Sequence, residues 1–533
     1  MSALAMGTAL GGSARLTYHE AFVAQGAREI IASGHWSYPL IGGRPWLEKP
    51  PLPFWLVALL GCCSGAIDPL VARLPSLVAG TLLVLGVGRL GARRHGNVVG
   101  LLAGAIQATT AWSVTRGRLA EADILLACLI TWTLVAFDRL REPDPAPRWC
   151  RWRRWRWAFF TLLGLTSLVK GVGFGLVLVL SVVVSVLIWG RDRRTARRLW
   201  FPAGWLWATA LTLAWPIAMV LEHGRPAIEI WLLHSVQRLR PGGGHGPFAG
   251  EGLLEYIPNV LGQGLPWTPL ALAGFWLSLR PVRRAWRRGG WRNLEAPSQV
   301  RPQDHLLWAW TIIPLVLVSL PGTRNAHYAI HAMVPWSLWA ARGLRHLARR
   351  RLGSRRESAR PRLVMCGCFL GLAAAYGLCF WALGPRFDRR GREWAFYEQA
   401  GEQVPVNEPV LLLYDDWDRD PYPTPFGPIP HDAGVRLFYL NRPACWHFDV
   451  ASILADEAGR CHGPATSGHG ASLVILGRPR DLPALEAAGR VEVLRQGPPV
   501  RWDRTYLLAR FWPGPGSRSG DVPGIAAATP FRR

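Results

Sequence analysis

Long apolar blocks recur along most of this 533-residue chain and constrain its fold more than any other feature. Blocks of roughly 13 to 22 residues approach or reach the length of a helix that crosses a bilayer. We identify ten: Leu74–Gly88, Val98–Val114, Leu119–Phe137, Trp157–Val169, Val172–Trp189, Trp200–Leu221, Leu253–Leu279, Leu306–Leu320, Ala329–Ala341 and Leu363–Leu383. The sequence therefore predicts a polytopic α-helical membrane protein.

Arginine-rich connections between these blocks alternate with connections that hold few cations. The basic ones are Asp138–Arg156 with seven arginines, Arg191–Arg198 with five, Arg280–Arg301 with seven and Arg342–Arg362 with nine. This alternation follows the positive-inside pattern and places the basic connections in the cytoplasm. Nucleic-acid binding is a rival explanation of the net charge of +26. It is less favoured, because the arginines recur at every second loop instead of forming one patch.

The N-terminal region raises two questions of topology. An eleventh apolar run, Pro51–Ile67, would invert every later loop if it crossed the membrane, so we expect it to lie along the interface. Residues 1–16 contain no segment long enough for a signal peptide or a span, although the topology requires this end to be outside. We therefore expect a further transmembrane helix to precede this sequence.

The pattern of apolar and polar residues changes after Gly384. Short β-prone runs alternate there with turn-rich stretches and two helix candidates, Arg392–Gln403 and Val450–Ala458. The expected strands are Val410–Tyr414, Val435–Leu440, Ser472–Leu476, Val491–Leu494 and Tyr506–Ala509. This pattern predicts a small α/β domain on the outer face of the membrane.

These observations divide the chain into four regions. Residues 1–73 form a first outer loop with an interfacial helix, and residues 74–383 form the transmembrane bundle. Residues 384–513 form the outer α/β domain, and a Gly/Pro/Ser-rich tail, residues 514–533, is expected to be disordered.

The nine cysteines divide in the same way. Cys445 and Cys461 fall in the outer domain, where an oxidising compartment would permit a disulfide, although a pair of free thiols is an equal alternative. The other seven cysteines show no metal-ligand spacing and are expected to be packing residues.

Only two of the 61 basic residues are lysines, Lys49 and Lys170. A lysine that persists in so arginine-rich a chain points to a need for a compact ammonium instead of a planar guanidinium. Lys49 stands in Trp46–Leu52, beside Glu48 and before two prolines, where a broken helix start exposes backbone groups able to hold anions. A lysine whose stem merely snorkels at the membrane surface is the alternative for both positions.

Chemistry is expected on the outer face, and the topology puts a set of polar residues there. They are His19, Glu20, Arg28, Glu29, Glu48, Lys49, Arg116, Arg118, Glu121, Asp123, Lys170, His234, Arg238, His245, Arg324 and His327. Arg116, Arg118 and Glu121 are read as ordinary interfacial charges. Asp123 is more informative, because it opens an apolar run and an unpaired carboxylate is costly at that depth.

Several of these motifs together resemble a known family. The order Glu20, Ala27–Glu29, Ser33–Trp36, Gly43–Trp46, Glu48–Leu52 and Ala72–Pro75 is similar to the first outer loop of GT-C membrane glycosyltransferases. The nearest branch is the one related to protein O-mannosyltransferases and the lipid A aminoarabinose transferase. Lys170-Gly171, Gln237-Arg238, His245 with Pro247-Phe248, Leu265–Trp267 and His327-Tyr328 follow in the family's order.

The resemblance implies transfer of a sugar from a polyprenyl-phosphate carrier to a lipid, glycan or protein acceptor, with inversion at the anomeric carbon. Cations must then stabilise the leaving phosphate. Lys49 and Arg238 are the first candidates, followed by Lys170 and Arg324. The family also suggests a divalent metal ion (zinc, magnesium or manganese) near Glu48 and His245. No organic cofactor is expected.

One position departs from the family's pattern. The family's first loop carries an Asp-Glu pair, whereas this chain has His19-Glu20. A histidine can act as a base or metal ligand near neutral pH, but it carries no permanent negative charge. Either Glu20 and Asp123 share the carboxylate role, with His19 assisting, or the acceptor differs, or the chain is impaired. We favour an active enzyme with a shifted acceptor.

Two other function classes stay open. A transporter or flippase predicts inverted repeats and charges at the middle of the membrane, and neither feature is found in the sequence. A non-catalytic, polyprenyl-lipid-binding relative is motivated by His19 in place of the acid.

Overall fold

The computed structural model covers residues 1–533 and is described here wherever the chain's placement is defined. The described residues are 1–12, 14–142, 149–239, 256–289, 304–320, 326–352, 359–388, 391–406, 408–414, 424–427, 429–456, 472–476, 481–499 and 505–514. They fall into two compact units. Unit 1 comprises Met1–Ser13, Gly34–Pro39 and Trp46–Pro385, and unit 2 comprises Ala14–Ser33, Leu40–Pro45 and Arg386–Arg533. The segment 1–73 thus contributes to both units.

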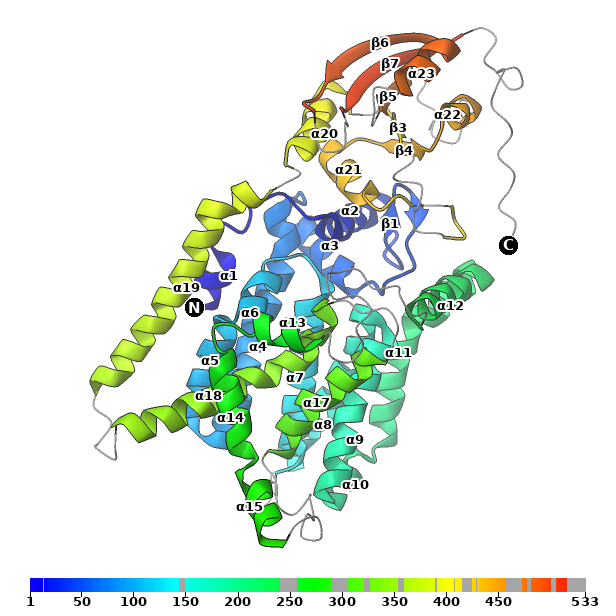
Figure 1. The fold of residues 1–533 in the computed structure, drawn as a ribbon. Helices are drawn as coiled ribbons and strands as arrows, with labels where there is room; N and C mark the ends of the chain where they lie inside the picture. The colour runs from blue at the N-terminus through cyan, green and yellow to red at the C-terminus, as the bar shows by residue number, and fades with distance from the viewer. Residues whose placement is uncertain are drawn as a thin grey trace. The chain divides into compact units, whose positions relative to one another are not determined.

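Unit 1 is helical (Figure 1). Its first half contains α1 (Ser2–Gly7), α3 (Leu52–Ser64), α4 (Pro69–His95), α5 (Asn97–Ala108), α6 (Ala111–Arg116), α7 (Ala122–Leu140), α8 (Trp149–Val172), the π-helix η1 (Gly173–Val177), α9 (Leu178–Gly190) and α10 (Arg193–Leu199). Its second half contains α11 (Pro202–His223), α12 (Arg225–Leu239), α13 (Tyr256–Gln263), α14 (Thr268–Ser278), α15 (Arg280–Gly289), α17 (His305–Ser319), the 3-10 turn η4 (Ala326–Ala329), α18 (Ile330–Leu352) and α19 (Ala359–Phe387).

Four helical segments in the described residues are long and apolar enough to cross a membrane. They are Pro69–His95, Arg153–Gly190, Pro202–His223 and Leu363–Arg386. Four shorter apolar helices accompany them: Leu52–Ser64, Asn97–Ala108, Thr268–Ser278 and His305–Ser319. The helical character of the apolar blocks is confirmed, whereas the number of crossings stays a prediction.

Two blocks predicted as single spans are each divided into two helices. Val98–Val114 is interrupted between α5 and α6, where the hydroxyls of Thr109 and Thr110 donate to carbonyls of the preceding turn. Side-chain bonds of this kind compete with helix propagation. The described part of Leu253–Leu279 is interrupted between α13 and α14 near Pro266, whose nitrogen has no proton to donate.

The segment from α8 to α9 is a tight helical hairpin. Lys170 (φ −143°, ψ 20°) and Gly171 (φ 82°, ψ 175°) leave the helical conformation. Gly171 permits the positive φ at little cost because it has no Cβ. Beyond the turn, a Cβ on Gly175 would lie 2.7 Å from the backbone carbonyl carbon of Thr166. Close to the turn, η1 therefore packs against the backbone of α8, and the expected outer connection at Lys170-Gly171 is a reversal of the chain.

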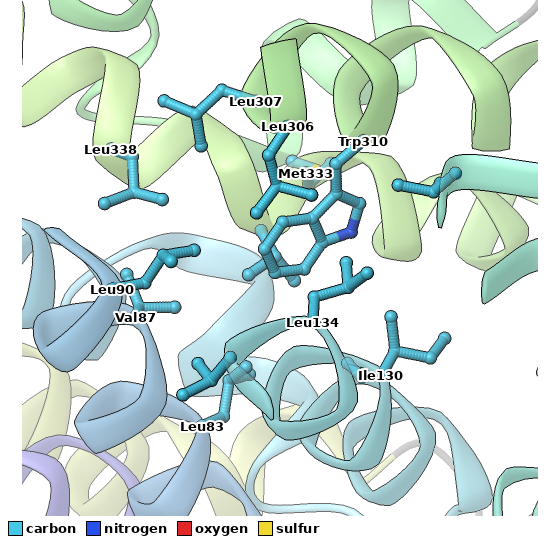
Figure 2. Close-up of a cluster of buried hydrophobic side chains, with 14 of the residues drawn as sticks. Leu83, Val87, Leu90, Ile130, Leu134, Leu306, Leu307, Trp310, Met333 and Leu338 are labelled. Carbon is cyan, nitrogen blue, oxygen red and sulfur yellow. The ribbon is translucent and has the colours of Figure 1, made fainter. Parts of the chain in front are cut away.

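The core of unit 1 is an apolar cluster shared by several helices (Figure 2). The indole of Trp310, from α17, is fully buried and lies among aliphatic side chains of α4, α7 and α18. Gly274 of α14 and Gly343 of α18 bring two helices close: a Cβ on Gly274 would lie 1.8 Å from the carbonyl oxygen of Trp339. Small residues at helix interfaces allow this approach in membrane proteins.

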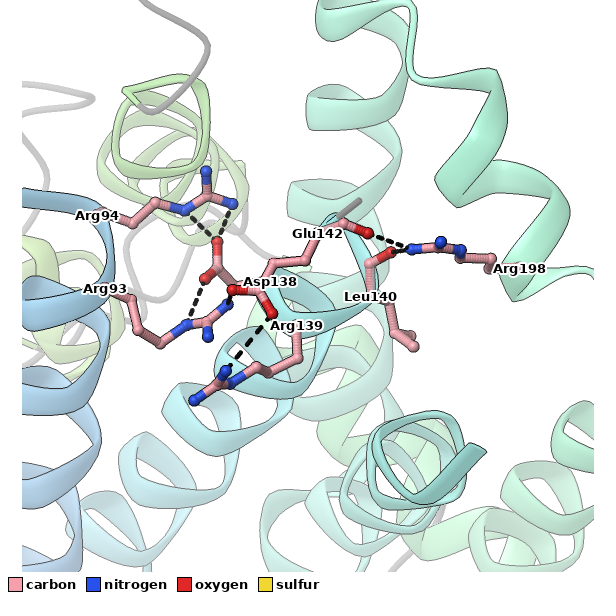
Figure 3. Close-up of polar contacts among 7 residues, drawn as sticks. All are labelled: Arg93, Arg94, Asp138, Arg139, Leu140, Glu142 and Arg198. Atoms are coloured by element: carbon pink, nitrogen blue, oxygen red, sulfur yellow. Dashed lines mark hydrogen bonds and ion pairs between the residues drawn. The ribbon is translucent and has the colours of Figure 1, made fainter. Parts of the chain in front are cut away.

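Some arginines near helix ends are neutralised by buried acids (Figure 3). Asp138, at the end of α7, is fully buried and forms ion pairs with Arg93 (3.1 Å) and Arg94 of α4. Asp304 accepts from Arg342 at 2.7 Å in the same manner. Burying a carboxylate is tolerated because it is paired and hydrogen-bonded.

Unit 2 contains a five-stranded sheet in the order β4-β3-β5-β7-β6. The strands are β3 (Val410–Leu413), β4 (Ala444–His447), β5 (Ser472–Leu476), β6 (Gly489–Gln496) and β7 (Leu507–Pro513). β3 pairs in parallel with β4 and β5, and β7 pairs antiparallel with β5 and β6. The helices are α20 (Gly391–Gln403), α21 (Ala433–Leu440), α22 (Val450–Asp456) and α23 (Leu482–Ala488). The predicted α/β character is confirmed.

One predicted strand in unit 2 is wrong. Val435–Leu440 lies in the helix α21, in which all eight residues are buried. A short helix buried on every side has no polar face, so its apolar run resembles a buried strand. Of the two cysteines that follow Gly384, Cys445 is disulfide-bonded, while Cys461 and the residues of the expected tail after Gly514 lie outside the described residues.

The remaining cysteines of the described residues with defined side chains are free. Cys128 is buried, as a packing residue should be. The other five, Cys62, Cys63, Cys366, Cys368 and Cys379, are exposed on their helices.

Part of the N-terminal region belongs to unit 2. It comprises α2 (Tyr18–Ser33) and the short strands β1 (Leu40–Ile41) and β2 (Arg44–Pro45). Before α2, Arg15 donates to Glu398 at 2.7 Å, and the backbone N–H of Leu16 donates to the hydroxyl of Tyr439. A segment distant in sequence thus completes this unit.

Candidate functional site

The best-defined polar cluster in unit 1 is built on the pair Asp123 and Lys170. Asp123 lies in the first turn of α7, and Lys170 lies at the turn of the α8 hairpin. The Lys170 ammonium donates to Oδ1 of Asp123 at 2.5 Å. Their side chains are 17% exposed for Lys170 and 6% exposed for Asp123, so both charges are largely removed from solvent. The sequence singled out both residues but did not pair them.

Aromatic and cationic groups surround this pair. The Lys170 ammonium lies 5.3 Å from the ring centre of Phe174 and 5.1 Å from that of Tyr328, within the range of cation–π attraction. Arg116 and His327 act electrostatically on Asp123. The cluster therefore holds one carboxylate among several cationic or titratable groups.

His331 of α18 is a member of this cluster that the sequence reasoning missed. Its side chain is fully buried, and neither ring nitrogen has a hydrogen-bond partner in the described part of the chain. It interacts electrostatically with both Lys170 and Asp123. The available signal was a histidine inside the apolar block Ala329–Ala341, four residues after His327, since ionisable groups inside such blocks usually mark function.

Glu48 and Lys49 lie in a loop of unit 1 that leads into α3. Trp231 of α12 fixes this loop by donating its indole N–H to the carbonyl oxygen of Leu47 at 2.9 Å. Oε2 of Glu48 is buried and has no hydrogen-bond partner among the described residues. Lys49 is half-buried, and within the same residues it forms no ion pair or hydrogen bond. An anchored loop thus presents one carboxylate oxygen and one ammonium without protein partners in the described part of the chain.

His19 and Glu20 are placed in unit 2, at the start of α2. The backbone N–H of Thr17 donates to Oε2 of Glu20 at 2.9 Å, and the N–H of Glu20 faces the Thr17 hydroxyl at 3.4 Å. This reciprocal arrangement is a capping box, in the sequence pattern Thr-x-x-Glu. The fully buried Glu20 carboxylate therefore has a structural function that the sequence reasoning did not consider. His19 is half-buried and lies 3.9 Å from Tyr18, between ring centres.

Other polar residues of the expected outer face hold the fold together. In unit 2, Arg28 donates to the carbonyl oxygen of Phe438 at 2.9 Å, and burial lowers its pKa to about 10, against the opposing influence of Glu29. Both oxygens of Glu29 accept backbone N–H groups of Gly42 and Gly43. These residues position the β1-β2 hairpin.

In unit 1, the three residues read as ordinary interfacial charges all have contacts. Arg116 pairs with Glu121 at 2.6 Å. Arg118 donates to the carbonyl oxygens of Met6 and Thr8.

Four polar residues of the expected outer face have no described side chain. His245 and Arg324 lie outside the described residues, and of the side chains of His234 and Arg238 in α12 nothing is described. Among the side chains that are described, no three His, Cys, Asp or Glu residues come together as a metal site would require. The structure thus brings Asp123 and Lys170 together and leaves the predicted metal pair, Glu48 and His245, a prediction.

The chain matches known proteins in sequence and in fold. Residues 14–234 match the model of the dolichyl-phosphate-mannose-protein mannosyltransferase family. The matched range contains Glu20, Glu48, Lys49, Asp123 and Lys170.

Two curated relatives are undecaprenyl phosphate-alpha-4-amino-4-deoxy-L-arabinose arabinosyl transferases. The one from Shewanella sediminis is 25% identical over 337 residues, and the second such transferase of Sodalis glossinidius is 28% identical over 333 residues. Each match covers 60% of this chain and 54% of the relative, so the chain spans about half the length of these relatives.

The similarity in fold to a solved structure extends over nearly the whole chain. ArnT from Cupriavidus metallidurans, bound to undecaprenyl phosphate, superposes with a TM-score of 0.69 at 16% identity. The match covers 96% of this chain and 97% of that one. With these matches the resemblance noted from the sequence is confirmed: the chain is similar in sequence to the protein mannosyltransferase family and to aminoarabinose transferases, and it is similar in fold to ArnT.

Proposed function

We propose that this protein is a membrane glycosyltransferase that takes a sugar from a polyprenyl-phosphate donor. The observation that carries the proposal is the buried Asp123–Lys170 pair, inside the range that matches the mannosyltransferase family. A carboxylate and an ammonium held together at the ends of apolar helices are costly to desolvate. Ionisable residues at such depth generally serve a function.

The proposed reaction is a direct displacement. The oxygen of an acceptor hydroxyl attacks the anomeric carbon, the bond from that carbon to the phosphate oxygen breaks, and the hydroxyl proton passes to a base. The polyprenyl phosphate leaves, and the anomeric centre is inverted. The acceptor is a lipid, a glycan or a protein hydroxyl. Because the curated relatives are named for undecaprenyl-phosphate-linked 4-amino-4-deoxy-arabinose, that donor is the first to test.

The two lysines are suited to different parts of this reaction. Lys49 forms no ion pair within the described residues, so its ammonium is available to neutralise the leaving phosphate. Lys170 is already neutralised by Asp123, so it would meet a phosphate only if that pair opened. We therefore assign the phosphate first to Lys49, with Arg238 and Arg324 as further candidates.

We assign the general base to the Asp123 cluster in preference to Glu20. A general base must reach the hydroxyl proton and be ionised. Asp123 is held in an ion pair with Lys170 at 2.5 Å, and His331 offers two ring nitrogens without described partners. The carboxylate of Glu20, by contrast, caps α2.

We place the reaction at the extracytoplasmic face, with the α/β domain on the same side. The support is the arginine-rich connections, which include Arg191–Arg198 and Arg280–Arg301 and favour the cytoplasm. Lys170 lies at the end of the hairpin arm opposite Arg191–Arg198.

A divalent metal ion at Glu48 is part of the proposal, but no step is derived through it. Oε2 of Glu48 would supply one ligand, and the described residues supply no cluster of three. If the ion is present, purified protein should contain close to one equivalent of zinc, magnesium or manganese by mass spectrometry. Dialysis against EDTA should remove the metal from the wild-type protein, and Glu48→Gln should lack it after purification. A metal-free wild-type protein with full activity would exclude the ion.

The transferase activity is tested by incubating full-length protein, in membranes, with labelled polyprenyl-phosphate sugars. We expect label to pass into the lipid, glycan or protein fraction, and Lys49→Ala to reduce the rate by roughly 100-fold or more, as for loss of a group that stabilises transition-state charge. Arg225→Ala, which removes an exposed cation of α12 that pairs with Glu229, is the matched control and should transfer normally.

The alternative is a polyprenyl-lipid-binding protein without catalysis. It is favoured if the wild-type protein binds the donor but transfers no label from any donor in the panel. Equal transfer by the wild-type and Lys49→Ala proteins would instead remove the phosphate assignment.

A further inference from the structure

Unit 1 contains a second polar feature, at the other end of the α8–α9 hairpin from Lys170. It is an open cavity of about 520 Å³, lined by Arg156 of α8 and by Arg193, Arg194, Arg197 and Arg198 of α10. η1 and α9 contribute 5 and 13 residues between Lys170 and this end, so the separation along the helix axis is roughly 27 Å. The cavity is thus distinct from the Asp123 cluster.

Two of the five arginines are fixed by protein contacts. Arg198 donates to the carbonyl oxygens of Leu140 and Glu142, both at 2.6 Å, which ties α10 to the end of α7 (Figure 3). The guanidinium of Arg156 lies 3.8 Å from the ring centre of Phe201, stacked for a cation–π contact. These contacts shape the cavity without removing its positive charge.

The other three arginines are not neutralised within the described structure. The side chains of Arg193, Arg194 and Arg197 form no ion pair or hydrogen bond with any described residue. The neighbouring acid, Asp192, instead caps α10 through Thr195 and pairs with Arg141 at 3.5 Å. By contrast, the nearby arginines Arg93 and Arg94 share the buried carboxylate of Asp138 (Figure 3).

Like charges gathered in one cavity repel one another, and a bound anion relieves the repulsion. Guanidinium groups match phosphate in geometry, because their planar N–H donors can contact two oxygens at once. The residues that line the cavity are all cationic, which excludes a divalent cation as its ligand. The chemistry of the cavity therefore selects a phosphate group.

Exposed aromatic residues indicate where that phosphate comes from. Trp200, directly after α10, is 82% exposed, and Trp157, next to Arg156, is 41% exposed. Tryptophans with one apolar and one polar end gather at the headgroup level of a bilayer. Basic pockets between transmembrane helices on the cytoplasmic side bind anionic lipid headgroups. From these observations we propose that the five-arginine cavity binds the phosphate headgroup of an anionic phospholipid.

The test uses the purified full-length protein and a triple variant, Arg193→Gln with Arg194→Gln and Arg197→Gln. Arg156 and Arg198 are kept, since they also hold the fold. The matched control removes three exposed arginines from other helices, by Arg284→Gln, Arg287→Gln and Arg349→Gln. Binding of phosphatidylglycerol, phosphatidylcholine and inorganic phosphate is measured for each protein in detergent by native mass spectrometry.

We expect the wild-type protein to retain phosphatidylglycerol and the triple variant to bind it at least about ten-fold more weakly, as loss of three near-surface cations implies. The control variant should bind phosphatidylglycerol as the wild type does. Binding of phosphatidylcholine should be the same for all the proteins. A triple variant that carries lysine at the three positions should recover most of the binding, which separates loss of charge from misfolding.

Three results would overturn the proposal. One is an equal loss of binding in the control variant, which would assign the effect to general surface charge. Another is equal retention of phosphatidylcholine and phosphatidylglycerol by the wild type. The third is occupancy of the cavity by inorganic phosphate at the affinity of the lipid, which would make it a site for the free anion. None of these readouts depends on sugar transfer, so the test is independent of the proposed enzymatic activity.

Discussion

At the scale of single residues, the side chain of Glu20 has two roles to separate, one in the reaction and one in capping a helix. The family's pattern assigns it to the reaction, and the structure assigns its carboxylate to the Thr17 amide in a capping box. Glutamine can replace glutamate in a capping box because its amide oxygen accepts the same hydrogen bond. Alanine cannot. The two substitutions therefore separate structure from chemistry.

Accordingly, Glu20→Ala should destabilise unit 2 by about 1 kcal/mol, the usual contribution of a helix cap. Glu20→Gln should unfold at nearly the wild-type temperature. If the carboxylate also acts in the reaction, both variants lose activity, and if it only caps α2, Glu20→Gln stays active. Thermal unfolding and label transfer, measured on the same preparations, provide the two readouts.

The Asp123–Lys170 pair leads to a second prediction at this scale. Removing one member of a buried ion pair leaves an uncompensated charge and costs about 3 to 5 kcal/mol. Asp123→Asn and Lys170→Met should each lower the unfolding temperature, whereas the double variant should recover part of the loss. Additive losses in the double variant would show that the two charges do not depend on each other. Activity should be lost in all three, because the double variant restores neutrality and not the carboxylate.

The residues of this site differ in how well the sequence predicts them. Asp123 and Lys170 are conspicuous as charges at the edges of apolar blocks, but their pairing depends on how α8 reverses, which side-chain patterns do not encode. His331 lies inside an apolar block, and a histidine in such a block is itself a signal of function. The capping role of Glu20 could be predicted from the sequence, because Thr17 precedes it by three residues in the pattern Thr-x-x-Glu.

At the scale of elements, the α8–η1–α9 hairpin positions Lys170. Gly175 of η1 packs against the backbone of Thr166, at a distance that leaves no room for a methyl group. Gly173, two residues earlier in the same element, has no atom within 4 Å of the position that an added Cβ would occupy. The two glycines form a matched pair for testing the hairpin.

Gly175→Ala should push η1 away from α8 and destabilise unit 1 by about 1 to 3 kcal/mol, the usual cost of overpacking. Gly173→Ala should be nearly neutral in the same unfolding assay. Because Lys170 lies at the turn, Gly175→Ala should also reduce sugar transfer more than Gly173→Ala. Equal stability of the two variants would contradict the close packing of η1 against α8.

How well the sequence predicts a helix or strand depends on how completely that element is buried. Ser472–Leu476 coincides with β5, and the helix candidates Arg392–Gln403 and Val450–Ala458 overlap α20 and α22 closely. These segments have flanking turns or a polar face that sets the period. Val435–Leu440 has neither, since α21 is buried on all sides, and its helical state depends on tertiary packing.

At the scale of the whole molecule, the two units have separate cores, and a pH prediction follows for unit 2. The buried hydroxyl of Tyr506 donates to Glu393, and burial, with the neighbouring Tyr397, raises the pKa of Tyr506 well above its usual value. An unfolded tyrosine ionises near pH 10. The phenol therefore stabilises the folded state below about pH 10, and this contribution is lost as the pH rises further.

Unit 2 should accordingly become sensitive to proteolysis above about pH 10. Tyr506→Phe has no ionisable group at this position and should show a flatter pH dependence. Segments of unit 1 in the same digestion provide the internal control. If the proteolysis of unit 2 depended as weakly on pH in the wild type as in Tyr506→Phe, the stabilising role of the Tyr506 hydroxyl would be contradicted.

The division of the N-terminal region has a consequence for biosynthesis. Residues 14–33 are made early, but the groups they contact, such as Asp388 and Tyr439, follow 373 and 423 residues after Arg15 and Leu16. At the usual rate of translation the delay is on the order of tens of seconds. During that interval α2 lacks the surface that buries it, so nascent chains arrested before residue 386 should expose this segment to protease or recruit a chaperone. The earliest part of unit 2 to be synthesised is thus among the last to gain its native contacts.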